Sequence, residues 1–320
     1  MRALAFIDLL GFSQMVGSSR NRATNILHDF YNISFRNISN EPEIQGDLFS
    51  DSLMAHSSNP AVLVNTICNI YRECLRKNND YEFPLDKYFL LPRGGISFGH
   101  VDIQNRMESP NLTKNFIISP ALVHSAKMES QIKGSRLLIA DTESINEQVF
   151  NWNQEIKSIL FDNSSFTFWS TFKYFDSLWF LDLSKSFDDQ KTEVTELIQI
   201  AESLVQANNR NKNVIEQHLQ TLRIGLLSYS KFLTPNNNPL LDNFLLEYQD
   251  DSYWLIWLTL IEMIMNSPES WALPSKREVI VFYKNVSLKP GWSKVITEIN
   301  KPRNDYVLGS FQEFISEMNV

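Results

Sequence analysis

Two aspartates stand in settings that favour metal binding. Asp8 interrupts the apolar run ALAFIDLLGFSQMV, and Asp51 lies in the short segment FSDS. A carboxylate withdrawn from water is costly unless a partner compensates its charge. With a divalent cation between them, two such carboxylates form the usual clamp for a nucleoside triphosphate. Each also has a plainer explanation, since Asp8 suits a helix cap or strand end and Asp51 suits a turn.

Three further segments carry groups suited to phosphate. The Leu10-Gly11-Phe12 turn after Asp8 offers backbone N–H groups. Arg93, in RGGISFG, is able to bind phosphate oxygens bidentately or to pair with a carboxylate. Lys127, in SPALVHSAKMES, offers a positive charge to a developing phosphoryl charge, or is simply an exposed helix residue.

The histidines and cysteines suggest no site of their own. The five histidines show no ligand spacing. Cys68 and Cys74 lie six apart in a predicted helix, so they do not face one another on adjacent turns. We interpret them as small core residues and expect a reducing, cytoplasmic compartment.

Composition indicates a soluble globular protein. The chain has 320 residues, 43% hydrophobic and 12% aromatic, with a formal net charge of −8. This charge argues against a broad nucleic-acid or anionic-membrane surface. The first residues, MRALAFIDLLGF, are too short and too acidic for a signal peptide. The longest apolar run, YWLIWLTLIEMIM at 253–265, is too short to span a membrane, so we expect no direct membrane insertion.

The elements that must position these residues alternate between strands and helices. LAFIDL reads as a strand, EIQGDLFSDSLMAHS as a hairpin and NPAVLVNTICNIYRECLRK as a helix. YFLLPRGGISFGHVDI reads as two strand-like pieces bent around a Pro-Arg-Gly-Gly turn. Strand NFIIS, a helix capped by Ser119, and the strand-like RLLIA and FKYFDSLWFLDL follow. The order β-α-β-β-α-β predicts an α+β, ferredoxin-like sheet. If the first strand lies beside the hairpin, Asp8 and Asp51 meet at one end of that sheet.

The chain changes character near residue 185, and we expect residues 1–185 to form one domain. Residues 186–320 are predicted to be a mostly helical C-terminal extension that packs on the sheet. An amphipathic stripe from Val194 to Val205 and a second over 214–227 are separated by a polar break at 208–211. A strand-like REVIVFY at 277–283 interrupts the later helices.

Four motifs, taken in order, resemble the class III nucleotide cyclases, and in detail the pyrimidine cyclases of bacterial Pycsar antiphage defence. The matching segments are DLLGFS at 8–13, FSDS at 49–52, RGGI at 93–96 and AKME at 126–129. The resemblance covers roughly residues 3–140. It implies a class III cyclase fold for this region and a homodimer with two sites at the subunit interface.

The resemblance also implies a mechanism. Asp8 and Asp51, helped by the main-chain carbonyl of Leu9, would bind two Mn²⁺ or Mg²⁺ ions per site. The 3′-hydroxyl of a bound nucleoside triphosphate would attack its own α-phosphate in line and expel pyrophosphate. The turn at 10–12 would receive the triphosphate, and Lys127 would complete the catalytic set.

Departures from the purine cyclases point to the base. Asp47 and Phe116 stand where that family reads adenine, so the purine-reading pair is missing. Val123 replaces an asparagine, and Lys127 replaces an arginine. By resemblance to the pyrimidine subgroup, Phe49 and Arg93 would shape a small base pocket.

The resemblance therefore implies conversion of UTP to 3′,5′-cyclic UMP, as a second messenger in antiphage defence, with a separate cyclic-nucleotide-activated effector downstream. A cytidylate cyclase acting on CTP, or a relaxed purine cyclase, is the alternative within the class. Outside it, a catalytically weak, cyclase-like nucleotide sensor or dimerisation module is the other hypothesis.

Overall fold

The computed structural model describes residues 2–105, 115–140, 159–162, 174–208 and 210–233. The chain divides into two compact units, Met1–Ile224 and Gly225–Val320. We describe the first; of the second, only residues 225–233 are described, as a continuation of one helix. The predicted helix at 253–265 and the strand at 277–283 lie outside the described residues.

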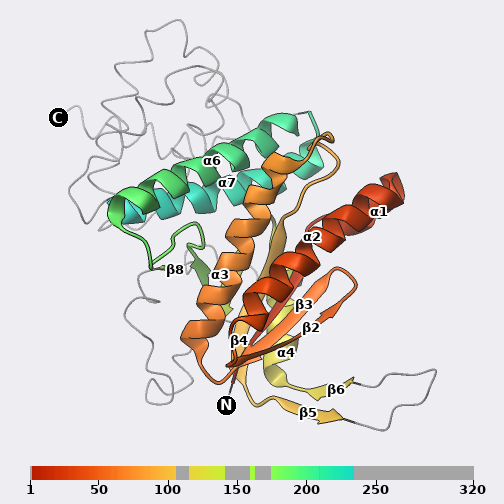
Figure 1. Cartoon of the computed structure of the whole chain (residues 1–320), viewed down its shortest axis with the longest axis vertical. Coiled ribbons are helices and arrows are strands. Elements are labelled where there is room, and N and C mark those ends of the chain that lie inside the picture. The colour runs from red at the N-terminus through yellow and green to blue at the C-terminus, as the bar shows by residue number, and fades with distance from the viewer. Residues whose placement is uncertain (1, 106–114, 141–158, 163–173, 209, 234–320) are drawn as a thin grey trace, which may run out of the picture. The chain divides into compact units, whose positions relative to one another are not determined.

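A mixed sheet organises the first unit (Figure 1). Its strand order is β2-β3-β1-β4-β7-β9-β8, in which β1 lies antiparallel between β3 and β4, and only the β4–β7 pairing is parallel. The first four strands have the ferredoxin-like order 2-3-1-4, so the predicted α+β class is confirmed. The strands are β1 Arg2–Leu9, β2 Ile44–Phe49, β3 Ser52–Ser57, β4 Pro92–Gly99, β7 Leu137–Ala140, β8 Leu160–Asp162 and β9 Tyr174–Ser177, with β5 Asp102–Asn105 and β6 Asn115–Ile118 forming a separate ribbon.

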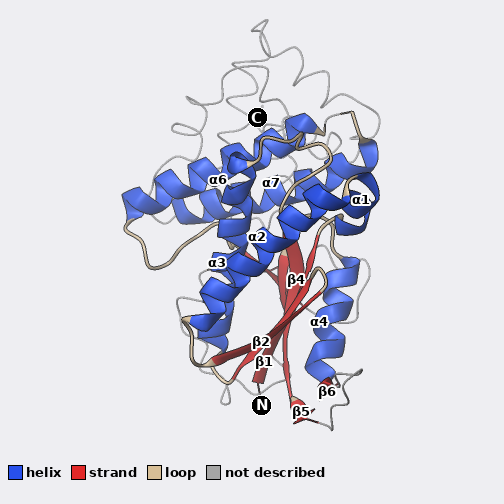
Figure 2. Ribbon diagram, turned by 45° about the vertical axis from the view of Figure 1, so that its right-hand side comes forward, coloured by secondary structure: helices blue, strands red, loops and turns tan. Residues whose placement is uncertain are grey.

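Helices cover both faces of this sheet. Figure 2 shows α2 and α3 on one face and α4 on the other. Asn59 and Ser119 cap α3 and α4 with their side chains, and a proline follows each cap; the Ser119 cap is the one that the sequence predicts. The helices are α1 Phe12–Ser18, α2 Arg20–Ser39, α3 Pro60–Lys77, α4 Pro120–Gln131, α6 Phe187–Ala207 and α7 Lys212–Leu233, with a short 3₁₀ turn η1 at Asn78–Asp80.

The predicted bend at Pro-Arg-Gly-Gly is wrong, because Pro92–Gly99 is one continuous strand. Its glycines serve close packing rather than a turn. A Cβ on Gly94 would lie 2.3 Å from the carbonyl oxygen of Phe6, and a Cβ on Gly95 would lie 2.9 Å from the Cβ of Met128. The strand therefore accepts a neighbouring backbone on one side and helix α4 on the other.

The long predicted strand FKYFDSLWFLDL is also shorter than expected. Strand β9 ends at Ser177; the Leu178 N–H still donates to the Ile159 carbonyl at 2.7 Å, and the chain then leaves the sheet in a turn over Leu178–Leu181. All four of these side chains are buried, including Trp179, whose indole N–H donates to the carbonyl of Ser135 at 3.0 Å. Their hydrophobicity reflects burial in the core rather than strand pairing.

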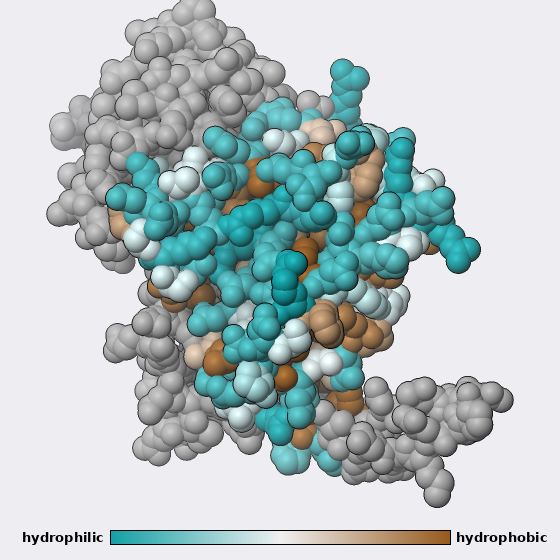
Figure 3. Space-filling view, in the orientation of Figure 1, coloured by the Kyte–Doolittle hydropathy of each residue, from teal (hydrophilic) through white to brown (hydrophobic). Residues whose placement is uncertain are grey.

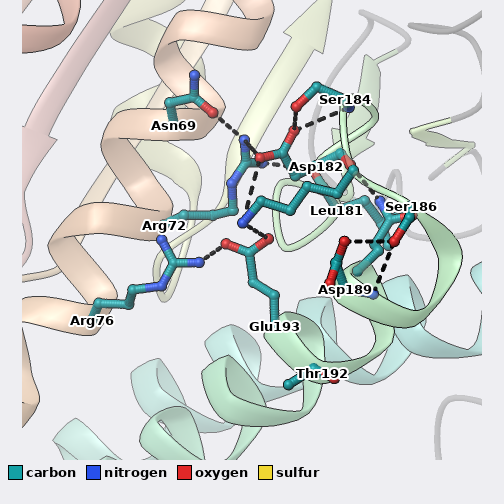
Figure 4. Close-up of polar contacts among 12 residues, drawn as sticks. Asn69, Arg72, Arg76, Leu181, Asp182, Ser184, Ser186, Asp189, Thr192 and Glu193 are labelled. Atoms are coloured by element: carbon teal, nitrogen blue, oxygen red, sulfur yellow. Dashed lines mark hydrogen bonds and ion pairs between the residues drawn. The ribbon is translucent and has the colours of Figure 1, made fainter.

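Buried charges join α6 to α3 (Figure 4). Arg72 is almost fully buried; it donates to the Trp179 carbonyl at 2.9 Å and lies 3.6 Å from the Asp182 carboxylate. Glu193, on α6, forms ion pairs with Arg76 on α3 and with Lys185, the latter at 2.8 Å. Because every charge here has an opposite partner, the junction is held without an isolated buried ion.

The outward faces have the polarity that the helical periodicity predicts. The predicted stripe on α6 is buried throughout (Val194, Leu197, Ile198, Ala201, Leu204 and Val205). Figure 3 shows a mostly hydrophilic surface over α2, α3 and α6. The thiols of Cys68 and Cys74 are both free and buried. Within the described residues, no helix has the length and hydrophobicity needed to cross a bilayer.

Candidate active site

Strand register brings the first aspartate next to the hairpin. Asp8 pairs with Ser52 on β3 and with Arg93 on β4. The Ser52 hydroxyl donates to Oδ1 of Asp8 at 2.9 Å. One residue further on, the Leu9 N–H donates to the main-chain carbonyl of Asp51 at 3.1 Å. The predicted meeting of Asp8 and Asp51 at one end of the sheet is therefore present in the structure.

The hairpin tip that carries Asp51 is a tight two-residue turn. Phe49 pairs with Ser52, so Ser50 and Asp51 form the turn itself. Ser50 has a φ of 51°, the left-handed region that side chains other than glycine rarely adopt. Its hydroxyl donates to Oδ1 of Asp51 at 2.9 Å, and the Tyr31 hydroxyl of α2 donates to its carbonyl at 2.8 Å.

The electrostatics of Asp8 suit a cation. Burial raises the pKa of Asp8 most, and the neighbouring charge of Asp51 raises it further. The Ser52 hydrogen bond and the Arg93 guanidinium act in the opposite direction but do not cancel these effects. An ion that neutralises both carboxylates would remove this penalty, so the two aspartates fit the divalent cation that the sequence predicts.

Arg93 lies among carboxylates. Its Nε is 2.7 Å from Oε1 of Glu129 on α4, and its Nη2 is 3.8 Å from Oδ2 of Asp8. The Nε–Oε1 contact is a close ion pair between a strand and a helix. Burial raises the pKa of Glu129, an effect that Arg93 opposes and the charges of Asp8 and Asp51 reinforce. When ionised, the carboxylates of Glu129 and Asp8 share one guanidinium, and the charge of Asp51 raises the pKa of both, leaving negative charge that a cation would compensate.

Main-chain groups complete the surroundings of the aspartates. Leu9 directs its N–H toward the Asp51 carbonyl, and in a regular strand the C=O of a residue lies on the same side as its N–H. Within the described residues, no group of three or more His, Cys, Asp or Glu side chains is arranged to hold a metal ion. The predicted metal set of Asp8, Asp51 and the Leu9 carbonyl contains only two such side chains and stays a prediction.

The turn after β1 has the conformation that a close backbone approach requires. Gly11 has a φ of 73° and precedes α1, while its carbonyl accepts from the N–H groups of Gln14 and Met15. The Leu10 N–H donates to the Leu91 carbonyl at 2.9 Å. The next amides, beginning at Phe12, are the first of a helix and have no partner within it. They remain available to an anion beside Asp8.

The remaining predicted residues lie at the surface. The Phe49 side chain is 49% exposed, and its ring centroid lies 6.2 Å from that of Phe6. Lys127 is exposed on α4, one turn after Val123, whose side chain is 54% exposed. Within this chain, the structure brings Asp8, Asp51 and Arg93 together but leaves Lys127 on an outward face.

Two contributors to the site escape sequence reasoning. Glu129 lies in the AKME motif and is buried against Arg93. Its position on the inner side of α4 is the only feature of the sequence that could have indicated this contact. Tyr31 reaches the hairpin from an unrelated helix, and nothing in the sequence marks it.

Helix α7 supports the loop behind Arg93. The N–H of Ser135 donates to the Thr221 hydroxyl at 2.8 Å, and the N–H of Gly134 donates to the Gln217 side chain at 2.5 Å. His218, buried on the same helix, packs edge-on against Phe89 with ring centroids 4.8 Å apart. Phe89 in turn lies against Gly11.

The structure is similar to solved nucleotide cyclases at low sequence identity. A bacterial light-regulated adenylyl cyclase is 16% identical, with 61% of this chain and 97% of that chain covered and a TM-score of 0.42. Adenylyl cyclase CyaB from P. aeruginosa is 14% identical, with 55% and 92% covered and a TM-score of 0.44. Guanylyl cyclase Cya2 is 16% identical, with 55% and 91% covered and a TM-score of 0.43. No protein-family model and no curated protein matches the chain.

Proposed function

We propose that this chain is a nucleotide cyclase that converts UTP to 3′,5′-cyclic UMP and pyrophosphate. The observation that carries the proposal is the meeting of Asp8 and Asp51 at the end of β1. Ser52 orients one carboxylate and Ser50 the other. The four motifs that resemble class III cyclases lie on the elements around this point.

The residues of the chain divide the work of an intramolecular phosphoryl transfer. Asp8, Asp51 and the Leu9 carbonyl would hold two Mn²⁺ or Mg²⁺ ions, which when bound neutralise phosphate charge and activate the 3′-hydroxyl. In the turn at 10–12, the Leu10 N–H is already paired with the Leu91 carbonyl, so the amides of Gly11 and Phe12 would orient the triphosphate. The chain thus acts mainly by positioning groups and neutralising charge, with no covalent step on a side chain.

The proposed pyrimidine preference rests on the surroundings of the site. Phe49 presents an exposed aromatic face beside Phe6, at the hairpin end near Asp51. Arg93, held by Glu129, would offer guanidinium N–H groups to a small base. Asp47 and Phe116 stand at positions where adenine-reading residues would be expected from the resemblance.

A homodimer follows from the same proposal. Lys127 faces outward on α4 beside Val123, so it reaches a catalytic centre only if a second copy faces it. The proposed setting is a cytoplasmic antiphage response in which cyclic UMP activates a separate effector. Residues beyond 185 would then have a regulatory or dimer-supporting role.

A screen of nucleoside triphosphates tests the proposal. Purified protein is incubated with UTP, CTP, ATP or GTP and Mn²⁺, and cyclic products are resolved by mass spectrometry. Asp51→Asn should abolish product, whereas Asp47→Asn, in the same hairpin, should retain it. Cyclic CMP as the main product would show that the chain is a cytidylate cyclase and not a uridylate cyclase. No product from any triphosphate with the wild type would contradict cyclase activity.

One observation favours a nucleotide sensor as the second candidate. Lys127 lies on an outward face of α4 rather than with the aspartates, and Val123 offers no polar group. A sensor would bind UTP or CTP, and lose binding on Asp51→Asn, without turnover at any protein concentration. Activity that rises with protein concentration as dimers form would exclude this candidate.

A further inference from the structure

The turn that carries Asp51 is strained at one residue and anchored from outside. Among the described residues, Ser50 is the one non-glycine with a positive φ. A positive φ at the first turn residue and a negative one at the second is the pattern of a type II′ turn, which favours glycine at the first position. Ser50 therefore occupies this conformation against its own preference.

The alternative two-residue turn differs by a flip of one peptide. Type I′ has a positive φ at both central residues, and the peptide that joins those residues is rotated by about half a turn relative to type II′. In this hairpin, that peptide comprises the Ser50 carbonyl and the Asp51 N–H. Asp tolerates a positive φ better than most residues, so the flipped turn is accessible to Asp51. The flip would redirect the Asp51 side chain.

One hydrogen bond holds this peptide in place. The Tyr31 hydroxyl donates to the Ser50 carbonyl at 2.8 Å, from a helix that packs across the sheet. A trans peptide directs its N–H opposite to its carbonyl, so the Asp51 N–H points away from Tyr31. The Leu9 N–H holds the next carbonyl, that of Asp51, at 3.1 Å.

We propose that Tyr31 is a positioning residue for Asp51: its hydroxyl locks the central peptide of the hairpin turn and so directs the Asp51 carboxylate toward Asp8. This assignment rests on the proposed function, because it concerns the geometry of the cation site. Tyr31 acts through the main chain, because its hydroxyl contacts the Ser50 carbonyl and not the Asp51 carboxylate. Its ring packs near Phe30, and only the hydroxyl reaches the turn.

The test measures Mn²⁺ binding to the full chain by electron paramagnetic resonance, with no nucleotide present. Tyr31→Phe removes the hydroxyl and keeps the ring, and should weaken Mn²⁺ binding about two- to tenfold, the factor expected for one net hydrogen bond. The matched control is Tyr81→Phe. It removes a hydroxyl that donates to the Asp29 carboxylate at 3.0 Å and is not part of the turn. It should bind Mn²⁺ as the wild type does.

A second substitution separates turn geometry from general stability. Ser50→Gly removes the φ strain and favours the type II′ turn, so adding it to Tyr31→Phe should restore much of the lost Mn²⁺ binding. Loss of general stability would not be repaired in this way. A thermal midpoint lowered more by Tyr31→Phe than by Tyr81→Phe, with no rescue, would make Tyr31 a structural residue and overturn the assignment.

The proposed function and this assignment fail differently. Wild-type Mn²⁺ binding that is lost in Asp51→Asn but unchanged in Tyr31→Phe would overturn the role of Tyr31 and leave the cation site intact. Equal binding by the wild type and Asp51→Asn would refute the cation site, and the role of Tyr31 with it.

Discussion

Gly94→Ala should damage the strand that carries Arg93. Gly94 pairs with Ile7, next to the pairing of Arg93 with Asp8. An added Cβ would lie 2.3 Å from the carbonyl oxygen of Phe6, 2.5 Å from Cδ1 of Ile7 and 2.9 Å from its Cα. The first and last of these are backbone atoms, which cannot turn away as a flexible side chain does.

The size of the effect follows from these distances. Carbon and carbonyl oxygen normally approach to about 3.3 Å, so β1 and β4 must separate locally by roughly 1 Å. Over-packing of this kind costs about 1–3 kcal/mol, and stretched ladder hydrogen bonds add to it. We expect Gly94→Ala to lower the free energy of unfolding by about 3 kcal/mol.

Urea unfolding followed by circular dichroism measures this loss. Gly17→Ala is the matched control, because Gly17 lies in α1 and its added Cβ meets nothing within 4 Å. Alanine in a helix should stabilise by about 0.5–1 kcal/mol. A Gly94→Ala protein within about 0.5 kcal/mol of the wild type would refute the close strand packing from which the prediction is derived.

Three further predictions concern pH and packing. The raised pKa of Asp8 means that its ionised form is unfavourable in the folded state, so Asp8→Asn should raise the thermal midpoint at pH 7. This gain should disappear below about pH 4, where Asp8 is protonated in both the folded and the unfolded chain. A lower midpoint for Asp8→Asn at pH 7 would contradict the pKa shift. Burial lowers the pKa of His218 to about 4, so the unfolded chain binds the extra proton first. Stability should therefore fall by up to about 3 kcal/mol as the pH drops from 6.5 toward 4, and a pH series on His218→Leu should lack this component. Asn78→Ala should cost about 2–4 kcal/mol in urea unfolding because it leaves the buried Leu90 N–H unpaired, whereas Asn37→Ala, at a partly exposed position, should cost less than about 1 kcal/mol.

The core of the site is predictable because strand pairing is a local regularity. A strand ending in Asp8 and a hairpin carrying Asp51 at its tip share an end of the sheet once they pair, as β1 and β3 do. The role of the two glycines in β4 is not predictable in this way. Two adjacent glycines satisfy a turn and a close backbone approach equally well, and only the neighbouring strand and helix decide between them.

Long-range contacts account for what the sequence does not reveal. Arg93 and Glu129 come together because α4 crosses the face of β4, and no spacing rule links a strand residue to a helix residue 36 positions later. Tyr31 likewise contacts Ser50 from helix α2, and no sequence spacing links that helix to the hairpin turn. Such partners depend on how layers pack, which residue patterns specify only in outline.

The contacts of α7 have a consequence for dissecting the protein. A chain cut after residue 185 would strip the Thr221 and Gln217 side chains from the amides of Ser135 and Gly134, directly behind the strand that carries Arg93. It would also uncover Phe89, which rests against Gly11. Inactivity of such a fragment would then reflect an unsupported site rather than a missing activator. A minimal fragment for biochemical work should retain both helices of the α6–α7 pair.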